Sequence, residues 1–224
     1  MELIHFDRGT IQPLKSFRAG FTLVELMVVL AIIGVILSIT FTGQSTFNKT
    51  LILENAAYDV ALTLRNAETY GIGSRAVGIT TNAGYGVHFN KTNPGSFLLF
   101  ADTYGGTSCA GMAPGCNPGD HIYTTGDVSV QNYSLGNNIT ISDFCAYNSE
   151  FGGHWSCSVA NGGGLTTLDI TFSRPNPTPA IQSNGFSYSA ACLSISSPAG
   201  GTRFVSVVSS GGITANAKPC PPTP

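Results

Sequence analysis

The chain has 224 residues, a formal net charge of −2, 42% hydrophobic residues and only 10% charged residues. This length allows one or two domains, and the small net charge excludes a strong field that would attract DNA or an anionic lipid surface. One apolar run near the N-terminus explains part of the charge deficit. The remainder is rich in Gly, Ser, Thr and Asn, which favours an exported β-rich domain over a cytosolic enzyme.

Residues 1–20 precede the apolar run Phe21–Ile39 and carry Arg8, Lys15 and Arg18. Positive charge just before an apolar segment indicates that this end stays on the cytoplasmic side. As a helix the run spans roughly 28 Å, close to the hydrocarbon thickness of a bilayer and too long for the apolar core of an ordinary signal peptide. The run therefore predicts a single membrane span.

Glu25 is the one ionisable residue inside this run. An ionised carboxylate in lipid costs about 2.5 kcal/mol or more, so a plain anchor would not place it there. A free amino group at Phe21 lowers this cost if the chain is cut between Gly20 and Phe21. Glycine before the cut suits a protease that approaches the backbone closely, because glycine has no Cβ.

The segment Arg-Ala-Gly-Phe-Thr-Leu-Val-Glu-Leu, residues 18–26, resembles the cleavage and methylation motif of type IV pilins and type II secretion pseudopilins. The resemblance implies that a prepilin peptidase removes the leader after Gly20 and that the new N-terminus, Phe21, is N-methylated. It implies that Glu25 neutralises the N-terminal amine of a neighbouring subunit during assembly. The implied partners are other pilin or pseudopilin subunits, the peptidase, the inner-membrane assembly platform and, before assembly, membrane lipid.

The resemblance also implies a location. The protein is expected in the inner membrane with a single pass and its globular domain outside the cytoplasm, and later in a periplasmic or extracellular fibre. The transmembrane or fibre-core helix is expected over residues 21–42. Many members of the family carry a proline further along this helix, where this chain has Thr42 and Gly43. A break near Gly43 is the alternative to a continuous helix, and glycine would break the helix less strongly than proline does.

Residues 43–75 are predicted to form an amphipathic helix. Apolar residues recur there at three- and four-residue steps, which is helical spacing with one apolar stripe. Gly71 and Gly73 end the pattern, as expected at a helix C-terminus. The stripe consists of Leu53, Ala56, Ala57, Val60, Leu64, Ala67 and then Tyr70 or Ile72.

Residues 76–224 are predicted to form a β-rich globular domain of short strands and turns. The fold class is therefore α+β, a long N-terminal helix packed on an antiparallel β-rich domain, as in the pilin fold. The predicted strands are Ala76–Thr81, Gly86–Asn90, Ser96–Ala101, Val128–Tyr133, Ile139–Tyr147, Leu168–Ser173, Ala180–Gln182, Phe186–Ile195, Arg203–Ser209 and Ile213–Ala215.

Six cysteines lie in the exported domain, and an even number there indicates disulfides. Many pairings are open; we favour pairs of sequence neighbours. The rival interpretation is a zinc site, which the absence of a C-x-x-C pair argues against. We therefore predict no metal and no cofactor. The favoured pairs are Cys109–Cys116, Cys145–Cys157 and Cys192–Cys220.

The C-terminal third carries a second, looser resemblance. The segments Leu168–Ser173, Ala191-Cys-Leu-Ser-Ile, Gly201-Thr-Arg-Phe-Val-Ser-Val and Ser210-Gly-Gly-Ile-Thr are similar to the GspH/FimT group of minor pseudopilins and pilins. Some members of that group bind DNA through basic residues near the C-terminus. Past Arg174 this chain has only Arg203 and Lys218, a weak footprint for phosphate contacts.

Other chemistry is weakly indicated. His88, His121 and His154 lie in the exported domain, but no G-x-S-x-G is present and nothing places a base beside a nucleophile, so we predict no catalytic residue and no enzyme. Asp120 and Asp127 flank a polar loop and either stabilise turns or, less readily, bind Ca²⁺.

Aromatic residues gather in the middle of the domain and either pack its interior or form a binding face; they are Tyr123, Tyr133, Tyr147, Phe151 and Trp155.

The sequence as a whole predicts a structural, minor subunit of a type IV pilus or type II secretion pseudopilus. The alternative is a DNA- or surface-binding minor pilin of a competence or adhesion pilus.

Overall fold

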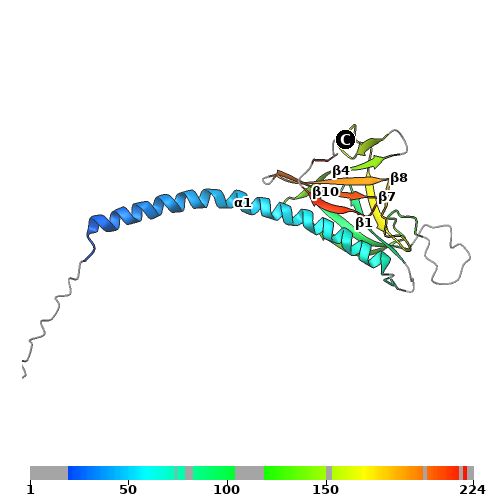
Figure 1. Cartoon of the computed structure of the whole chain (residues 1–224), viewed down its shortest axis with the longest axis horizontal. Helices are drawn as coiled ribbons and strands as arrows, with labels where there is room; N and C mark the ends of the chain where they lie inside the picture. Colours follow the sequence, from blue (N-terminus) through cyan, green and yellow to red (C-terminus); the bar gives the residue numbers. More distant parts are fainter. Residues whose placement is uncertain are drawn as a thin grey trace, which may run out of the picture. The chain divides into compact units, whose positions relative to one another are not determined.

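The computed structural model describes residues 20–73, 75–78, 83–103, 119–149, 153–198, 201–216 and 219–220, without the side chains of 42–47 and 216. The chain divides into two compact units, one up to Gln44 and one from Ser45. Helix α1, Leu23–Ile72, contributes to both units, and every described strand lies in the second (Figure 1). All strand pairs are antiparallel, so the predicted α+β class is confirmed.

The second half of α1 is amphipathic, as its spacing predicts. The apolar stripe from Leu53 to Ala67 is buried, and no member exceeds 6% exposure. The helical assignment runs through Gly43 to Ile72, so the break considered at Gly43 does not occur. At the C-terminal end, a Cβ at Gly71 would overlap the backbone carbonyl of Phe172, so only glycine lets the last turn come this close to the sheet.

The first sheet has six strands in the order β3-β2-β1-β6-β7-β8. Its central strands are nearly continuous runs of buried residues. Helix α1 packs on one face of the sheet, and the segment before β3, which contains His121 and Tyr123, covers part of the other face. The strands are β1 Gly84–Asn90, β2 Ser96–Asp102, β3 Val128–Ser134, β6 Thr167–Phe172, β7 Ala180–Ser183 and β8 Phe186–Tyr188.

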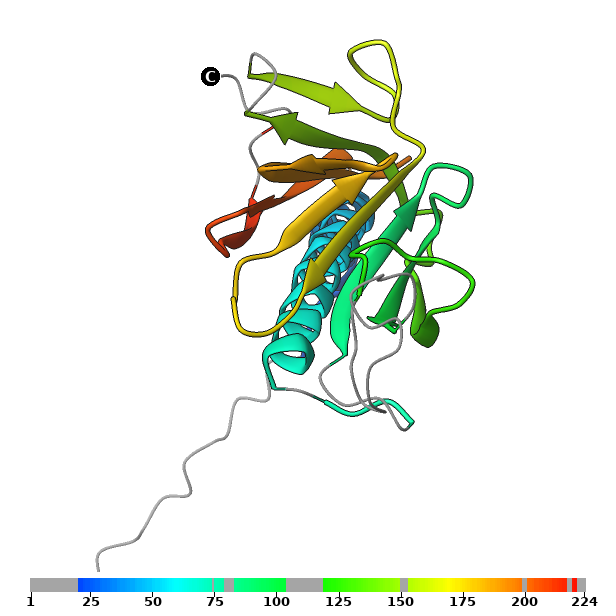
Figure 2. The same cartoon turned by 90° about the vertical axis from the view of Figure 1, so that its right-hand side faces the viewer.

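The second sheet has five strands in the order β11-β10-β9-β4-β5. Apolar residues of both sheets and of α1 join in one core, and Figure 2 shows the helix behind the strands of both sheets. Arg65 adds a polar link, because its Nη2 donates to the Ile213 carbonyl at 3.3 Å. The strands are β4 Thr140–Asn148, β5 His154–Cys157, β9 Ala190–Ser197, β10 Gly201–Val208 and β11 Ile213–Asn216.

One predicted strand is wrong in an informative way. The segment Phe186–Ile195 is not one strand but two, β8 in the first sheet and β9 in the second. Ser189 separates them: its N–H donates to Tyr147 O at 2.9 Å, and its carbonyl accepts from Ser209 N at 2.8 Å. The chain thus changes sheets at one residue, and the hydrophobic pattern on both sides carries no sign of it.

Two further differences concern short strands. Strand β5 was not predicted, because four residues show too little alternation; it forms by pairing with β4. Of the predicted strand Ala76–Thr81, only Val77 makes an isolated bridge, and residues 79–82 lie outside the described part of the chain. The other predicted strands are confirmed to within about two residues at each end, the usual uncertainty of element boundaries.

Candidate functional site

Helix α1 begins with a side-chain cap. The Thr22 hydroxyl accepts a hydrogen bond from the Glu25 N–H at 3.2 Å, and the Thr22 carbonyl accepts the Leu26 N–H at 3.2 Å. Thr22 is therefore the N-cap, and Glu25 is the acidic residue of the first turn. The spacing Thr-x-x-Glu is the capping-box signature, so the start of this helix is also marked in the sequence.

Gly20 and Phe21 precede the helix without regular secondary structure, and both are exposed. A Cβ added at Gly20 would meet no atom within 4 Å, so nothing in this fold requires glycine there. If glycine is needed at position 20, the reason lies in another molecule, for example a protease that approaches the bond between Gly20 and Phe21. The leader residues 1–19 lie outside the described part of the chain.

The segment Leu23–Phe41 is long and apolar enough to cross a membrane. Every described residue from Phe21 to Phe41 is exposed. Its hydroxyl groups donate hydrogen bonds to backbone carbonyls of the same helix: Ser38 Oγ donates to Gly34 O at 2.8 Å, and Thr40 Oγ1 donates to Ile36 O at 2.9 Å. Glu25 is the single ionisable side chain in this segment, and no described residue pairs with its carboxylate.

The histidines of the β-rich domain occupy separate environments. His88 Nδ1 lies 2.7 Å from Asp169 Oδ1, and burial raises the pKa of Asp169 while the His88 hydrogen bond lowers it. His121 Nδ1 lies 3.0 Å from Thr171 Oγ1, and burial lowers the His121 pKa. His154 is exposed at the start of β5. Among the described residues no serine hydroxyl bonds to His88 or His121, so the sites contain no serine–histidine nucleophile pair.

Asp102 is fully buried beside the His121 segment. Its carboxylate accepts the His121 N–H at 2.9 Å and the Asp120 N–H at 3.2 Å. Burial raises the pKa of Asp102 to about 7, against the lowering effect of the His121 N–H. The carboxyl group thus titrates close to neutral pH and ties the segment before β3 to the end of β2.

Asp120 and Asp127 act on the backbone. Asp120 Oδ1 accepts the Ile122 N–H at 3.1 Å. Asp127 Oδ1 accepts the Thr103 N–H at 2.8 Å, and its Oδ2 accepts the Thr124 N–H at 2.8 Å. These contacts are the turn-stabilising role that the sequence analysis set against Ca²⁺ binding.

Disulfides join Cys145 to Cys157 and Cys192 to Cys220. They are two of the three sequence-neighbour pairs favoured above. Cys145 and Cys157 lie opposite each other on β4 and β5, and this bond therefore fastens the edge strand β5 to its sheet. The third predicted pair, Cys109–Cys116, lies outside the described residues.

Asp143 lies beside the first of these disulfides but is not a metal ligand there, because the neighbouring sulfurs are bonded to each other. Its Oδ1 accepts the Ser158 hydroxyl at 2.7 Å and the Val159 N–H at 2.9 Å, and its Oδ2 accepts the Ala160 N–H at 3.0 Å. One carboxylate thus holds the turn that follows β5, a role that the sequence did not reveal.

The aromatic residues separate into three contacts. Tyr123 packs on His88, with ring centroids 4.8 Å apart, and Tyr133 stacks on Phe97 at 5.1 Å. A third contact joins the rings of Tyr147 and Trp155 at 5.3 Å. Phe151 lies outside the described residues. The expected cluster is therefore not one binding face.

Comparison with known proteins bears on the N-terminal segment. Residues 15–41 match the prokaryotic N-terminal methylation motif. No curated protein and no solved structure matches the chain. The matched residues include Gly20, Phe21, Glu25 and the whole apolar segment Leu23–Phe41. The motif and the apolar helix indicate a membrane-anchored subunit like the type IV pilins and pseudopilins, a family of structural proteins rather than enzymes.

Proposed function

We propose that this protein is a structural subunit of a type IV pilus or of a type II secretion pseudopilus, assembled through α1. One observation carries the proposal. A single carboxylate, Glu25, lies in the first turn of an exposed apolar helix, inside the methylation motif. A helix that serves only as an anchor gains nothing from a charge in its apolar segment.

The chemistry of Glu25 suggests how a subunit enters the fibre. Before assembly the carboxylate lies near the membrane surface, at the positive end of the helix dipole, which stabilises it modestly. In a fibre core, the terminal amine of Phe21 on a neighbouring subunit compensates the charge. An unpaired charge in a low-dielectric core costs several kcal/mol, so subunits that are out of register are disfavoured.

Processing and topology follow from the same segment. We propose that a prepilin peptidase cuts after Gly20 and that Phe21 is N-methylated. Lys15 and Arg18 keep the leader in the cytoplasm, and the domain beyond α1 lies outside it. The disulfides Cys145–Cys157 and Cys192–Cys220 support this orientation, since disulfides persist in oxidising compartments.

We further propose that the subunit is minor, on the similarity of residues 168–214 to the GspH/FimT group. DNA capture gains no support from the described residues. Arg203 donates to the neighbouring Thr202 carbonyl at 3.1 Å and is half-buried, and Lys218 lies outside the described part of the chain. Specific DNA binding needs several phosphate contacts.

The decisive measurement is the intact mass of the full chain recovered from host membranes. We expect a protein that begins at Phe21 and carries one added methyl group. A chain that keeps residues 1–20 would overturn the proposal. The minor role has its own test, the amount of this chain in sheared fibres; if it forms the bulk of the fibre mass, the minor assignment fails while the fibre role stands.

A further inference from the structure

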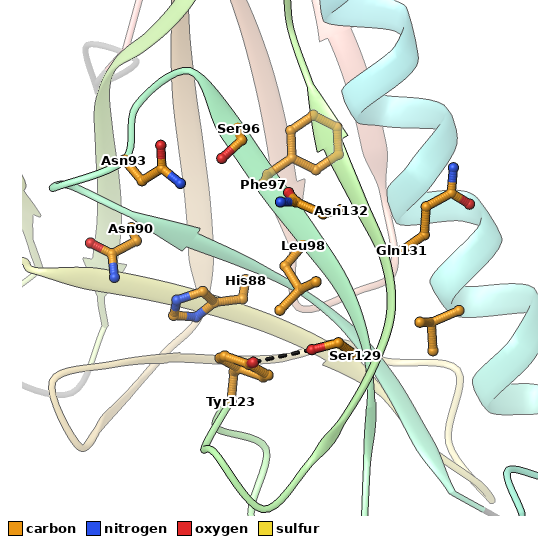
Figure 3. A pocket seen from close by; sticks show the side chains of 11 residues that line it. His88, Asn90, Asn93, Ser96, Phe97, Leu98, Tyr123, Ser129, Gln131 and Asn132 are labelled. Carbon is orange, nitrogen blue, oxygen red and sulfur yellow. Dashed lines mark hydrogen bonds between the residues drawn. The ribbon is translucent and has the colours of Figure 1, made fainter.

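The first sheet carries an open pocket of about 410 Å³ that the assembly role does not use (Figure 3). Its floor is a row of paired residues, in which His88 lies opposite Leu98 and Leu98 opposite Asn132. Directly paired residues point to the same side of a sheet. The neighbouring Val87 and Phe89 are fully buried in the core on the other side. The pocket therefore opens on the face turned away from the core.

The polar lining of this pocket consists mainly of carboxamides and hydroxyls. Of the residues that the structure describes, no Lys, Arg, Asp or Glu lines it. A carboxamide offers both a donor and an acceptor, and a hydroxyl does the same. Such a lining matches a ligand that carries many neutral hydroxyl groups and offers no counter-charge to an ion. The residues concerned are Asn90, Asn93, Asn132, Ser96 and Ser129.

His88 is held in place by the neighbouring strand β6, on which Asp169 lies directly opposite it. Its Nδ1 contacts Asp169, whose side chain is only 1% exposed and which also accepts the Tyr123 N–H. Because a carboxylate only accepts hydrogen bonds, this contact places a proton on Nδ1 and leaves Nε2 of a neutral ring as an acceptor. The buried carboxylate thus orients one polar group of the lining before any ligand arrives.

Tyr123 supplies an aromatic wall. Its ring lies 4.8 Å from the His88 ring and 5.2 Å from the Phe100 ring, which fixes its plane. Its hydroxyl lies 3.2 Å from Ser129 Oγ, a hydrogen bond that joins the segment before β3 to β3 itself (Figure 3). The exposed part of this ring, together with Leu98, gives the pocket an apolar surface beside its amides.

We propose that this pocket binds a neutral saccharide. The amides of Asn132 and Asn90 bond its hydroxyls, His88 Nε2 accepts one of them, and the C–H face of the sugar ring lies against Tyr123. Saccharides combine hydroxyl edges with an apolar ring face, which is the combination of surfaces present here. A volume of about 410 Å³ is within the range of small-molecule pockets, roughly 300–1,000 Å³. The subunit would then carry a glycan-binding surface in addition to its place in a fibre.

The test uses the full chain, purified in a zwitterionic detergent, since a detergent with a sugar head group would compete. Saturation-transfer NMR is recorded with maltotriose, cellotriose, chitotriose and mannotriose, and with galacturonic acid trimer and a short DNA duplex as anionic probes. We expect saturation transfer to at least one neutral trisaccharide and none to the anionic probes.

The variant Asn132→Ala should weaken that binding at least about tenfold, as expected when a hydrogen bond to a ligand is lost. The Asn132 side chain is exposed, so the variant should melt at the same temperature as the parent. Asn176→Ala removes an exposed amide outside the pocket and should bind like the parent. Tyr123→Phe keeps the ring and should retain binding. Saturation of no neutral sugar, or unchanged binding in Asn132→Ala, would overturn the proposal. This outcome is independent of cleavage and assembly, which need no ligand.

Discussion

The Thr22 hydroxyl accepts the backbone N–H of Glu25 at 3.2 Å, so the residue proposed to guide assembly belongs to the turn that starts the helix. Thr22 and Glu25 have different roles in this turn. Thr22 satisfies one of the unpaired N–H groups of the first turn. Glu25 places a negative charge in that turn, where the helix dipole favours it.

Glu25→Gln should leave the protein cleaved and membrane-inserted but poorly incorporated into fibres. The amide keeps the size of the side chain and loses the charge that pairs with a neighbouring amine. The measurement is the ratio of fibre-bound to membrane-bound protein in sheared and fractionated cells. Glu54→Gln, a change on the same helix in the second unit, is the control and should assemble normally. Normal assembly of Glu25→Gln would remove the proposed role of this charge.

Thr22→Val should loosen the first turn of α1 without changing the charge. Loss of a Ser or Thr cap costs about 1 kcal/mol, and Thr22→Ser should retain most of it. Amide hydrogen exchange of the full chain in detergent is the measurement, and Glu25 and Leu26 should lose protection in Thr22→Val. Equal protection in both variants would show that the hydroxyl does not cap the helix.

Gly71→Ala should destabilise the β-rich domain. The added Cβ would overlap the Phe172 carbonyl, and forced shifts in a packed interior cost on the order of 1–3 kcal/mol. Gly95→Ala is the matched control, because a Cβ there meets no atom within 4 Å. Denaturant unfolding of both variants measures the difference. If Gly71→Ala is as stable as Gly95→Ala, the close approach of helix and sheet is wrong.

Asp102 should make stability depend on pH below neutrality. Its pKa is about 7 in the folded state against 3.8 for an ordinary aspartate, so the folded protein holds the proton that the unfolded chain releases. The contribution of Asp102 to the free energy of unfolding is therefore largest below pH 3.8, and it is lost as the pH rises through about 7. The full effect is on the order of 4 kcal/mol.

Asp102→Asn should flatten this dependence, because an amide oxygen can still accept the His121 or Asp120 N–H without titrating. The measurement is the difference in unfolding free energy between the parent and the variant across that range. Taking the difference limits the influence of other titrating groups such as Asp169, whose pKa is also raised. Parallel curves for the two proteins would show that Asp102 does not titrate as proposed.

Most of the fold was accessible from the sequence, because its signals are local. The stripe from Leu53 to Ala67 has helical spacing, and all of it is buried. The alternation around Leu168 and Phe204 located β6 and β10. The split at Ser189 was not predicted, because the hydrophobic pattern continues from β8 into β9 although the two strands lie in different sheets.

The sequence by itself carries what we propose for the N-terminal segment. The apolar run, Gly20, Phe21 and Glu25 lie close together in the chain, and their proposed roles depend on cleavage and on lipid rather than on distant residues. Only the tertiary structure decided the surroundings of the buried carboxylates. Asp169 meets His88 across two strands that are 81 residues apart in the chain, and Asp102 meets the N–H of His121 through a turn. Such contacts depend on which distant strands become neighbours in a sheet, and the local pattern, which fixes the buried face of each strand, does not record that choice.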